Sequence, residues 1–177
     1  MLYNKIKNDK QQSFFSTYTI YFVSLMMKFL IMFILCNFCL ILESEAKIKI
    51  IDGDSLEIDG KEYRLQGIDA PEYMQECYDE FEQEYRCGEK AYEALQKIVG
   101  TDVKCNVVEK DRYERYVSVC VSRGKDIAEE LVRQGWAVAY TQYTNYYVEA
   151  EKEAKVLKKG IWQGRFMKPE LYRALYR

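Results

Sequence analysis

Residues 63–72 have the sequence Tyr63-Arg64-Leu65-Gln66-Gly67-Ile68-Asp69-Ala70-Pro71-Glu72. Apolar Tyr63 and Leu65 alternate with two polar residues, which predicts a strand with one apolar face. Pro71 lacks an amide donor and disfavours a helical conformation of the residue before it, so the strand must end in a turn. One arginine and two carboxylates therefore lie at the point where a strand becomes a loop.

Two other segments carry the same types of side chain. The upstream one is an acidic turn between apolar runs, Ile51-Asp52-Gly53-Asp54-Ser55, and the downstream one supplies further cations, Asp111-Arg112-Tyr113-Glu114-Arg115. Carboxylate oxygens suit a hard divalent cation, and planar guanidinium groups suit phosphate. Together the three segments indicate a metal-assisted phosphodiesterase.

These segments, followed by Leu131-Val132-Arg133-Gln134-Gly135-Trp136, have the order and spacing found in the staphylococcal nuclease (thermonuclease) family. The chain resembles that family from about Lys47 to about Trp162. The resemblance implies an α+β, mainly β fold, a five-stranded OB-fold barrel with about three α-helices. It also implies a calcium-dependent, sugar-nonspecific endonuclease that hydrolyses DNA and RNA, breaks the 5′ P–O bond and leaves 3′-phosphate ends.

The resemblance assigns the calcium ligands. They are the carboxylates of Asp54 and Asp69 and the backbone carbonyl of Ala70, a position where the family often has threonine. Two carboxylates, a carbonyl and water form a workable set for Ca²⁺. The alternative for Asp54 is an ordinary turn aspartate after Gly53, and Asp52 is expected to cap the turn instead of binding metal.

The resemblance also assigns the catalytic residues. Glu72 is the expected general base, which positions or deprotonates the attacking water, although it could be simply the first acid of an acidic loop. Arg64 and Arg115 are the expected phosphate-binding groups that stabilise the more negative transition state. The family pattern is Asp-x-Tyr-Gly-Arg, but this chain has Glu114 in place of glycine. That departure adds an acid beside Arg115 and removes the residue best suited to a positive φ.

Two tyrosines resemble positions that line the nucleotide pocket in the family. Tyr113 and Tyr140 are expected to stack on a base of the substrate. Since the chain has 16 tyrosines, a place in the core or on the surface is the alternative for each.

The overall charge does not suggest a general nucleic-acid-binding protein. Residues 47–177 carry 22 Lys and Arg against 25 Asp and Glu, whereas non-specific binders neutralise phosphates with an excess of cations. The acids are concentrated at residues 72–84, so the cations of residues 152–177 can still attract a polyanion locally. The chain has no histidine, which excludes histidine general bases and histidine-ligated zinc.

Residues 1–46 differ in kind from the rest. Residues 14–42 are largely apolar, but Lys28 divides them into runs shorter than the roughly 20 residues that a spanning helix needs. The second run begins with Met27-Lys28, continues to Leu42 and is followed by Ser44-Glu45-Ala46. This pattern predicts a secretory signal peptide cleaved after Ala46.

A cleaved signal would leave residues 47–177 as one domain, either secreted or periplasmic. Met26 or Met27 is an alternative start, which would exclude residues 1–25 from the protein. After cleavage we expect a monomer without stable membrane anchoring. A retained N-terminal anchor, which would make the protein a membrane-tethered nuclease, is the alternative.

Export would make the cysteines candidates for disulfides. Four follow the signal segment, Cys77, Cys87, Cys105 and Cys120, and allow three pairings. If residues 111–114 form the turn of a hairpin, the numbers of opposed residues add up to 225, so Cys105 would face Cys120. Cys77 would then pair with Cys87. The alternative, metal binding, lacks a C-x-x-C spacing to support it.

The remaining elements follow from periodicity and from turn residues. We expect strands at 47–51, 55–58, 61–66, 103–109 and 116–121, and helices at 88–99, 127–134 and 146–159. Asp59-Gly60 predicts a tight hairpin turn, and Asp126 with Glu129 predicts a capping box. Gly160 is expected to end the third helix.

A rival interpretation is a non-catalytic OB-fold module that binds nucleic acid or protein. Glu114 and the acidic surface favour it, whereas the set of carboxylates and arginines opposes it. The expected partners of the enzyme are DNA and RNA as substrates.

Overall fold

The computed structural model describes residues 21–34 and 46–176. The chain divides into two compact units, Met1–Ser44 and Glu45–Arg177. In the first unit, residues 21–34 are helical. Residues 35–45, which include most of the predicted cleavage segment, lie outside the described residues, so the signal peptide remains a prediction. Within the described ranges, no helix is long and apolar enough to cross a membrane.

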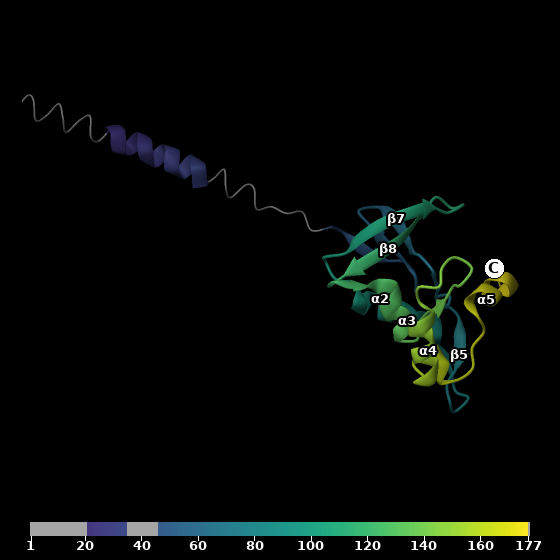
Figure 1. Cartoon of the computed structure of the whole chain (residues 1–177). Coiled ribbons are helices and arrows are strands. Elements are labelled where there is room, and N and C mark those ends of the chain that lie inside the picture. The colour runs from purple at the N-terminus through teal and green to yellow at the C-terminus, as the bar shows by residue number, and fades with distance from the viewer. Residues whose placement is uncertain (1–20, 35–45, 177) are drawn as a thin grey trace, which may run out of the picture. The chain divides into compact units, whose positions relative to one another are not determined.

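The second unit is built on a six-stranded sheet. Five of its strands form one path, β1 (Ile48–Ile50), β2 (Ser55–Ile58), β3 (Lys61–Leu65), β8 (Tyr116–Ser122) and β7 (Lys104–Lys110). The sixth, β9 (Lys125–Asp126), pairs with β8, and β3 runs parallel to β8 whereas the other neighbours are antiparallel. This α+β, mainly β arrangement is the expected OB fold. Figure 1 shows the strands β7 and β8 beside the helices α2 and α3.

Both predicted hairpins are present. Asp59 and Gly60 have φ values of 51° and 78°, the left-handed pair that a two-residue β-turn of type I′ requires. In the β7–β8 hairpin, Cys105 pairs with Cys120 as expected from the residue numbers, but beside the turn Lys110 pairs with Tyr116, one residue away from the expected register. A bulge between Val107 and Glu109 shifts the register by one residue toward the turn.

Two short ladders were not expected from the sequence. β4 (Ile68–Asp69) pairs with β10 (Val138–Ala139), and β5 (Glu76–Tyr78) pairs with β6 (Glu84–Arg86). The acidic segment at 72–84 is therefore largely a hairpin and not a loop. Ladders of two or three residues have too little periodicity to be seen in the sequence.

Five helical segments follow the first strands in this unit. They are α2 (Cys87–Ile98), α3 (Ile127–Arg133), α4 (Val148–Val156), the 3₁₀ helix η1 (Gly160–Gln163) and α5 (Pro169–Tyr176). The Asp126 side chain caps α3 as expected, because it accepts hydrogen bonds from the N–H groups of Ala128 and Glu129 at 2.8 and 3.2 Å. The Glu129 side chain pairs with Arg133, so of the expected capping box only the hydrogen bonds to the Asp126 side chain are present.

Helix α4 is shorter than expected. It ends at Val156, and Lys158 takes the left-handed conformation with φ 49°. The N–H of Lys159 donates to the carbonyl of Ala154 at 2.9 Å, which closes the helix in a Schellman-type turn. Lys158 thus occupies the position where glycine is usual, and the prediction that Gly160 ends this helix was wrong.

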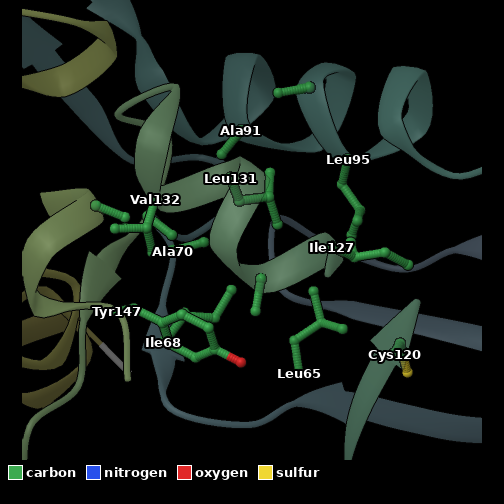
Figure 2. Packing of buried hydrophobic residues seen from close by; sticks show 14 of the residues in the cluster. Leu65, Ile68, Ala70, Ala91, Leu95, Cys120, Ile127, Leu131, Val132 and Tyr147 are labelled. Atoms are coloured by element: carbon green, nitrogen blue, oxygen red, sulfur yellow. The ribbon is translucent and has the colours of Figure 1, made fainter. Parts of the chain in front are cut away.

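The core lies between the sheet and α2 and α3. Figure 2 shows the side chains of these elements meeting in one cluster. Fully buried members include Leu65, Ile68, Leu95, Ile127 and Leu131. Each such side chain contributes roughly 1.5–3 kcal/mol when it leaves water. Because Leu65 and Ile68 are both in this core, the turn between them is held rigidly.

Candidate nuclease site

The turn between β3 and β4 brings Arg64 close to Asp69. Gly67 has φ +74°, and a Cβ at this position would lie 2.3 Å from Cγ2 of Thr144. Glycine is therefore required here, because any larger residue would be strained and would clash. The Gly67 carbonyl accepts a hydrogen bond from the N–H of Tyr140 at 2.8 Å, which ties the turn to a second loop.

Arg64 joins two buried carboxylates. Its Nη1 lies 2.6 Å from Oδ1 of Asp54, and its Nη2 lies 3.2 Å from Oδ1 of Asp69. Asp54 is 3% exposed and Asp69 is 1% exposed. The two carboxylates thus bind to opposite nitrogens of one guanidinium.

The loop that carries Asp54 is fixed by its backbone. A Cβ at Gly53 would lie 2.7 Å from the Cβ of Ala70, so only glycine allows this close approach. The N–H of Ala70 donates to Oδ2 of Asp54 at 3.0 Å, and the N–H of Leu65 donates to the Asp54 carbonyl at 2.9 Å. Asp54 is thus bonded to both ends of the β3–β4 turn.

Negative charge accumulates at this point. Burial raises the pKa of Asp52 to about 6, and the nearby charge of Asp54 adds to the rise. Burial also raises the pKa of Asp69, although Arg173 and Arg64 oppose the rise. The charge of Asp54 is the largest cause that raises the pKa of the Arg64 guanidinium. The cluster therefore favours additional positive charge.

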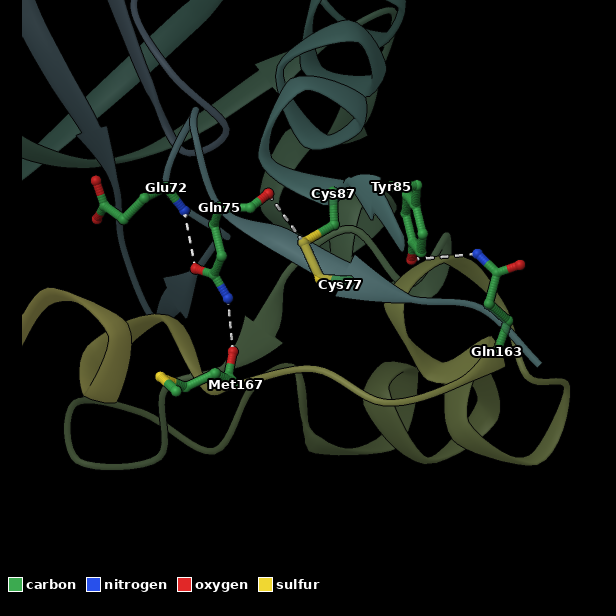
Figure 3. Close-up of a disulfide and its surroundings, with 7 residues drawn as sticks. All are labelled: Glu72, Gln75, Cys77, Tyr85, Cys87, Gln163 and Met167. Carbon is green, nitrogen blue, oxygen red and sulfur yellow. Dashed lines mark hydrogen bonds between the residues drawn. A yellow bond between two sulfur atoms is a disulfide. The ribbon is translucent and has the colours of Figure 1, made fainter. Parts of the chain in front are cut away.

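Glu72 follows the turn and is positioned through Gln75. The fully buried Gln75 side chain accepts a hydrogen bond from the Glu72 N–H at 3.2 Å and donates to the Met167 carbonyl at 2.7 Å. Figure 3 shows Gln75 between these two segments, beside the Cys77–Cys87 disulfide. The loop of Glu72 is thus attached to the C-terminal segment.

Arg173 on α5 reaches the same carboxylates. Its Nη1 lies 2.8 Å from Oδ1 of Asp69 and 3.0 Å from Oε1 of Glu72, and its Nη2 lies 3.1 Å from Oδ2 of Asp69. Burial opposes the charge of Arg173, but the hydrogen bonds and charges of Asp69 and Glu72 outweigh burial and raise its pKa. Sequence reasoning counted Arg173 only among the C-terminal cations and missed it as a site residue.

The β7–β8 turn positions Arg115. Oδ1 of Asp111 accepts the N–H groups of Tyr113 and Arg115 at 2.9 and 3.0 Å, and Oδ2 accepts the Arg115 Nε–H at 2.8 Å. Glu114 has φ 66°, so it takes the left-handed conformation for which glycine is usual. The Glu114 carboxylate pairs with Lys110 at 3.0 Å and not with Arg115.

One cavity of about 1150 Å³ brings these groups together. All the expected catalytic and base-binding side chains line it, namely Arg64, Glu72, Arg115, Tyr113 and Tyr140, and Arg173 joins them. Tyr113 is largely exposed, and the guanidinium groups of Arg112 and Arg115 lie over its ring, 4.9 and 5.5 Å from the centroid. Tyr140 packs against Tyr143, with ring centroids 5.1 Å apart. Three separate turns and α5 therefore meet at one opening.

The carboxylate oxygens of Asp54 and Asp69 are the type of ligand that a hard cation prefers. The oxygens Oδ2 of Asp54 and Asp69 accept hydrogen bonds from Ala70 and Arg173, and each oxygen has a second lone pair that a cation could use. Among residues 21–34 and 46–176, no group of three or more acidic, cysteine or histidine side chains could hold a metal ion. The two carboxylates would therefore need backbone oxygens and water to complete a calcium shell. The Ala70 carbonyl remains a prediction.

Both disulfides have the expected pairing. Cys77 is bonded to Cys87 and Cys105 to Cys120. The second crosses the β7–β8 ladder, and the first joins β5 to the start of α2. The interpretation of these cysteines as structural cross-links is confirmed.

One signal for the C-terminal contribution was present in the sequence. Pro169 begins α5, a position where proline is favoured, and Glu170 lies in the first turn. These features could have predicted the helix. They could not have predicted that Arg173 points toward Asp69, because that contact spans 104 residues.

Comparison with known proteins agrees with this geometry. The family model described as staphylococcal nuclease homologue matches residues 62–164. The succinoglycan biosynthesis protein ExoI of Rhizobium meliloti is 37% identical over 118 residues, covering 64% of this chain and 62% of that protein. An uncharacterized endonuclease of Haemophilus influenzae is 33% identical over 123 residues (65% and 64%). A probable endonuclease LCL3 of Schizophyllum commune is 32% identical over 117 residues (56% and 39%).

The match thus spans less than two thirds of each of these relatives. Within this chain, the family match covers Arg64, Asp69, Glu72 and Arg115. Asp54 precedes the family match and Arg173 follows it. Since that match covers more than half of the 177 residues, the chain belongs to the staphylococcal nuclease homologue family.

Proposed function

We propose that the protein is an exported, calcium-dependent, sugar-nonspecific endonuclease that hydrolyses phosphodiester bonds of DNA and RNA and leaves 3′-phosphate ends. The observation that carries this proposal is the shared guanidinium of Arg64. Arg64 lines a cavity together with Glu72 and Arg115, and it also pairs with Asp54 and Asp69, which lie behind the lining residues. Relatives named as endonucleases support the same activity.

The side chains have distinct roles in this proposal. Arg64 and Arg115 donate hydrogen bonds to the phosphate oxygens and stabilise the charge that develops in the transition state. Glu72 holds the attacking water by a hydrogen bond and accepts its proton. Tyr113 and Tyr140 offer ring faces to a base, which suits both DNA and RNA because every base can stack.

Asp54 and Asp69 would hold the calcium ion, together with the carbonyl of Ala70. When bound there, calcium supplies Lewis-acid stabilisation of a phosphate oxygen. The positive charge it brings would offset the carboxylates here, where burial and then the charge of Asp54 raise the pKa of Asp52 to about 6.

Export is supported by the two disulfides, since such bonds persist in oxidising compartments. In this proposal residues 27–46 act as the signal peptide, and residues 47–177 remain after cleavage at Ala46. N-terminal sequencing of the protein collected outside the cytoplasm tests this. A first residue of Lys47 is expected, and an intact N-terminus would favour the retained anchor.

Incubation of the protein with plasmid DNA and with RNA, in calcium and in a chelator, tests the activity. We expect cleavage of both polymers only with calcium, and end analysis should find 3′-phosphates. The rival, a non-catalytic binding module, predicts no cleavage in either condition. Glu72→Gln separates the two further, because it should abolish cleavage while nucleic-acid binding is retained.

A further inference from the structure

The C-terminal segment beyond the family match is anchored to the core of the site. Arg165 exchanges two backbone hydrogen bonds with Tyr78 of β5, at 2.8 and 2.9 Å. Two residues later, the Met167 carbonyl accepts the Gln75 side chain, and the following Pro169 is fully buried. The start of α5 is thus fixed on the same hairpin that follows Glu72 (Figure 3).

The guanidinium of Arg173 is held along part of its edge. Its contacts with Asp69 and Glu72 use three of the five N–H donors that arginine carries. The side chain is 27% exposed and lines the same cavity as Arg64 and Arg115. An arginine already fixed by a buried carboxylate loses little further freedom when it binds a ligand.

The cavity is more positive than the protein around it. Its lining has five cationic side chains, Arg64, Lys110, Arg112, Arg115 and Arg173, and four acidic ones, Asp52, Glu72, Glu109 and Asp111. Residues 47–177 as a whole carry more acids than bases. A phosphate ester is the anion that the four guanidinium groups around this opening fit best.

We propose that Arg173 is a phosphate-binding residue of the nuclease site, supplied by α5 from outside the family match. One part of its guanidinium holds the Glu72 carboxylate in place, and its remaining N–H groups donate to a phosphate of the bound strand. This inference rests on the proposed nuclease function. It adds to that function a third guanidinium and a role for the C-terminal helix.

Binding without turnover tests the inference most cleanly. The whole chain is titrated, in chelator, against a fluorescein-labelled single-stranded DNA oligonucleotide at several NaCl concentrations. For Arg173→Met we expect an affinity about tenfold lower and a salt slope smaller by about 0.7, the value for one phosphate contact on a single strand. Arg173→Lys should bind the oligonucleotide several-fold more weakly than wild type but retain the wild-type salt slope. The reason is that lysine keeps the positive charge but cannot donate two parallel hydrogen bonds as the planar guanidinium does.

Lys168→Met is the matched control. It removes one charge from the same segment, but Lys168 is exposed and is not among the residues that line the cavity. Its salt slope should equal that of the wild type. In cleavage assays with calcium, Arg173→Met should have a raised KM and a lowered kcat. Arg173→Lys should recover both parameters in part, and Lys168→Met should leave both unchanged.

The outcomes separate this inference from the proposed function. A wild-type protein that neither binds nor cleaves overturns both. A wild-type protein that binds and cleaves, with Arg173→Met unchanged in affinity and slope, overturns only the role of Arg173. Tighter binding by Arg173→Met also overturns it and identifies an inhibitory contact instead. If circular dichroism finds Arg173→Met unfolded, Arg173→Lys decides, and wild-type affinity in that variant contradicts the proposal.

Discussion

Asp111 and Arg115 are joined three times across the β7–β8 turn. Oδ1 of Asp111 accepts a hydrogen bond from the backbone N–H of Arg115 at 3.0 Å. Oδ2 of Asp111 accepts a hydrogen bond from the Arg115 Nε–H at 2.8 Å and lies 2.7 Å from the Arg115 Nη2. One carboxylate thus fixes both the backbone and the guanidinium of an expected phosphate-binding residue.

Asp111→Asn should therefore weaken catalysis through Arg115. The amide oxygen can keep a backbone hydrogen bond, but the charged pair with the guanidinium is lost. We expect kcat/KM on DNA to fall about tenfold, the size of one charge-assisted hydrogen bond. The matched control is Asp102→Asn. The Asp102 carboxylate accepts hydrogen bonds from the Ser122 hydroxyl and the Arg123 backbone N–H, in a turn that does not line the cavity. Equal activity losses in both variants would contradict a specific role for Asp111.

The same carboxyl should make stability depend on pH. Burial raises the pKa of Asp111, but hydrogen bonds from Arg115 and Tyr113 outweigh burial and hold it below the ordinary 3.8. A carboxyl with a lowered pKa contributes stability above its unfolded pKa, and that contribution is lost as pH falls through the folded value. Urea unfolding should therefore find wild type more stable than Asp111→Asn at pH 7. The difference should shrink below about pH 4, and a difference that grows there would contradict this.

Glu114→Gly should stabilise the turn. Glu114 has φ 66°, and a non-glycine residue in this conformation costs about 1 kcal/mol. The lost ion pair with Lys110 is exposed and offsets little of the gain. Removal of an acid beside Arg115 should also tighten DNA binding. Lys158→Gly, at φ 49° in a distant turn, should raise stability similarly and leave DNA binding unchanged.

The two disulfides should differ in their effect on activity. Each closes a short loop, so replacing either pair with serine should lower the free energy of unfolding by about 2–3 kcal/mol. Only loss of Cys77–Cys87 should also lower kcat at a temperature where both variants are folded. The reason is that this bond lies beside Gln75, which holds Glu72 to the C-terminal segment. Equal kcat values in the two variants would argue against this.

Local signals were enough to predict much of the site's position. Asp59-Gly60 predicts one hairpin through its backbone preferences, and the turn expected at residues 111–114 predicts that Cys105 faces Cys120 in another. The Arg64 to Glu72 stretch contains a strand, a left-handed glycine and a proline within ten residues. Such features act on neighbouring residues, so they can be recognised without the rest of the chain.

The features that could not be predicted depend on contacts between distant segments. The ladder of Ile68 and Asp69 with β10 exists because the two loops meet, and neither segment alone has strand periodicity. Arg173 reaches Asp69 only because Gln75 and Tyr78 anchor the segment before α5. Lys158 adopts a left-handed conformation that its side chain does not favour, so the sequence gives no sign of the turn that ends α4.

Calcium titration of the protein by calorimetry, with no nucleic acid present, tests the central claim most directly. We expect one calcium ion per chain, loss of that binding in Asp54→Asn and in Asp69→Asn, and unchanged binding in Asp111→Asn. Calcium binding that survives both of the first two substitutions would contradict a shared ion between Asp54 and Asp69, and with it the proposed site.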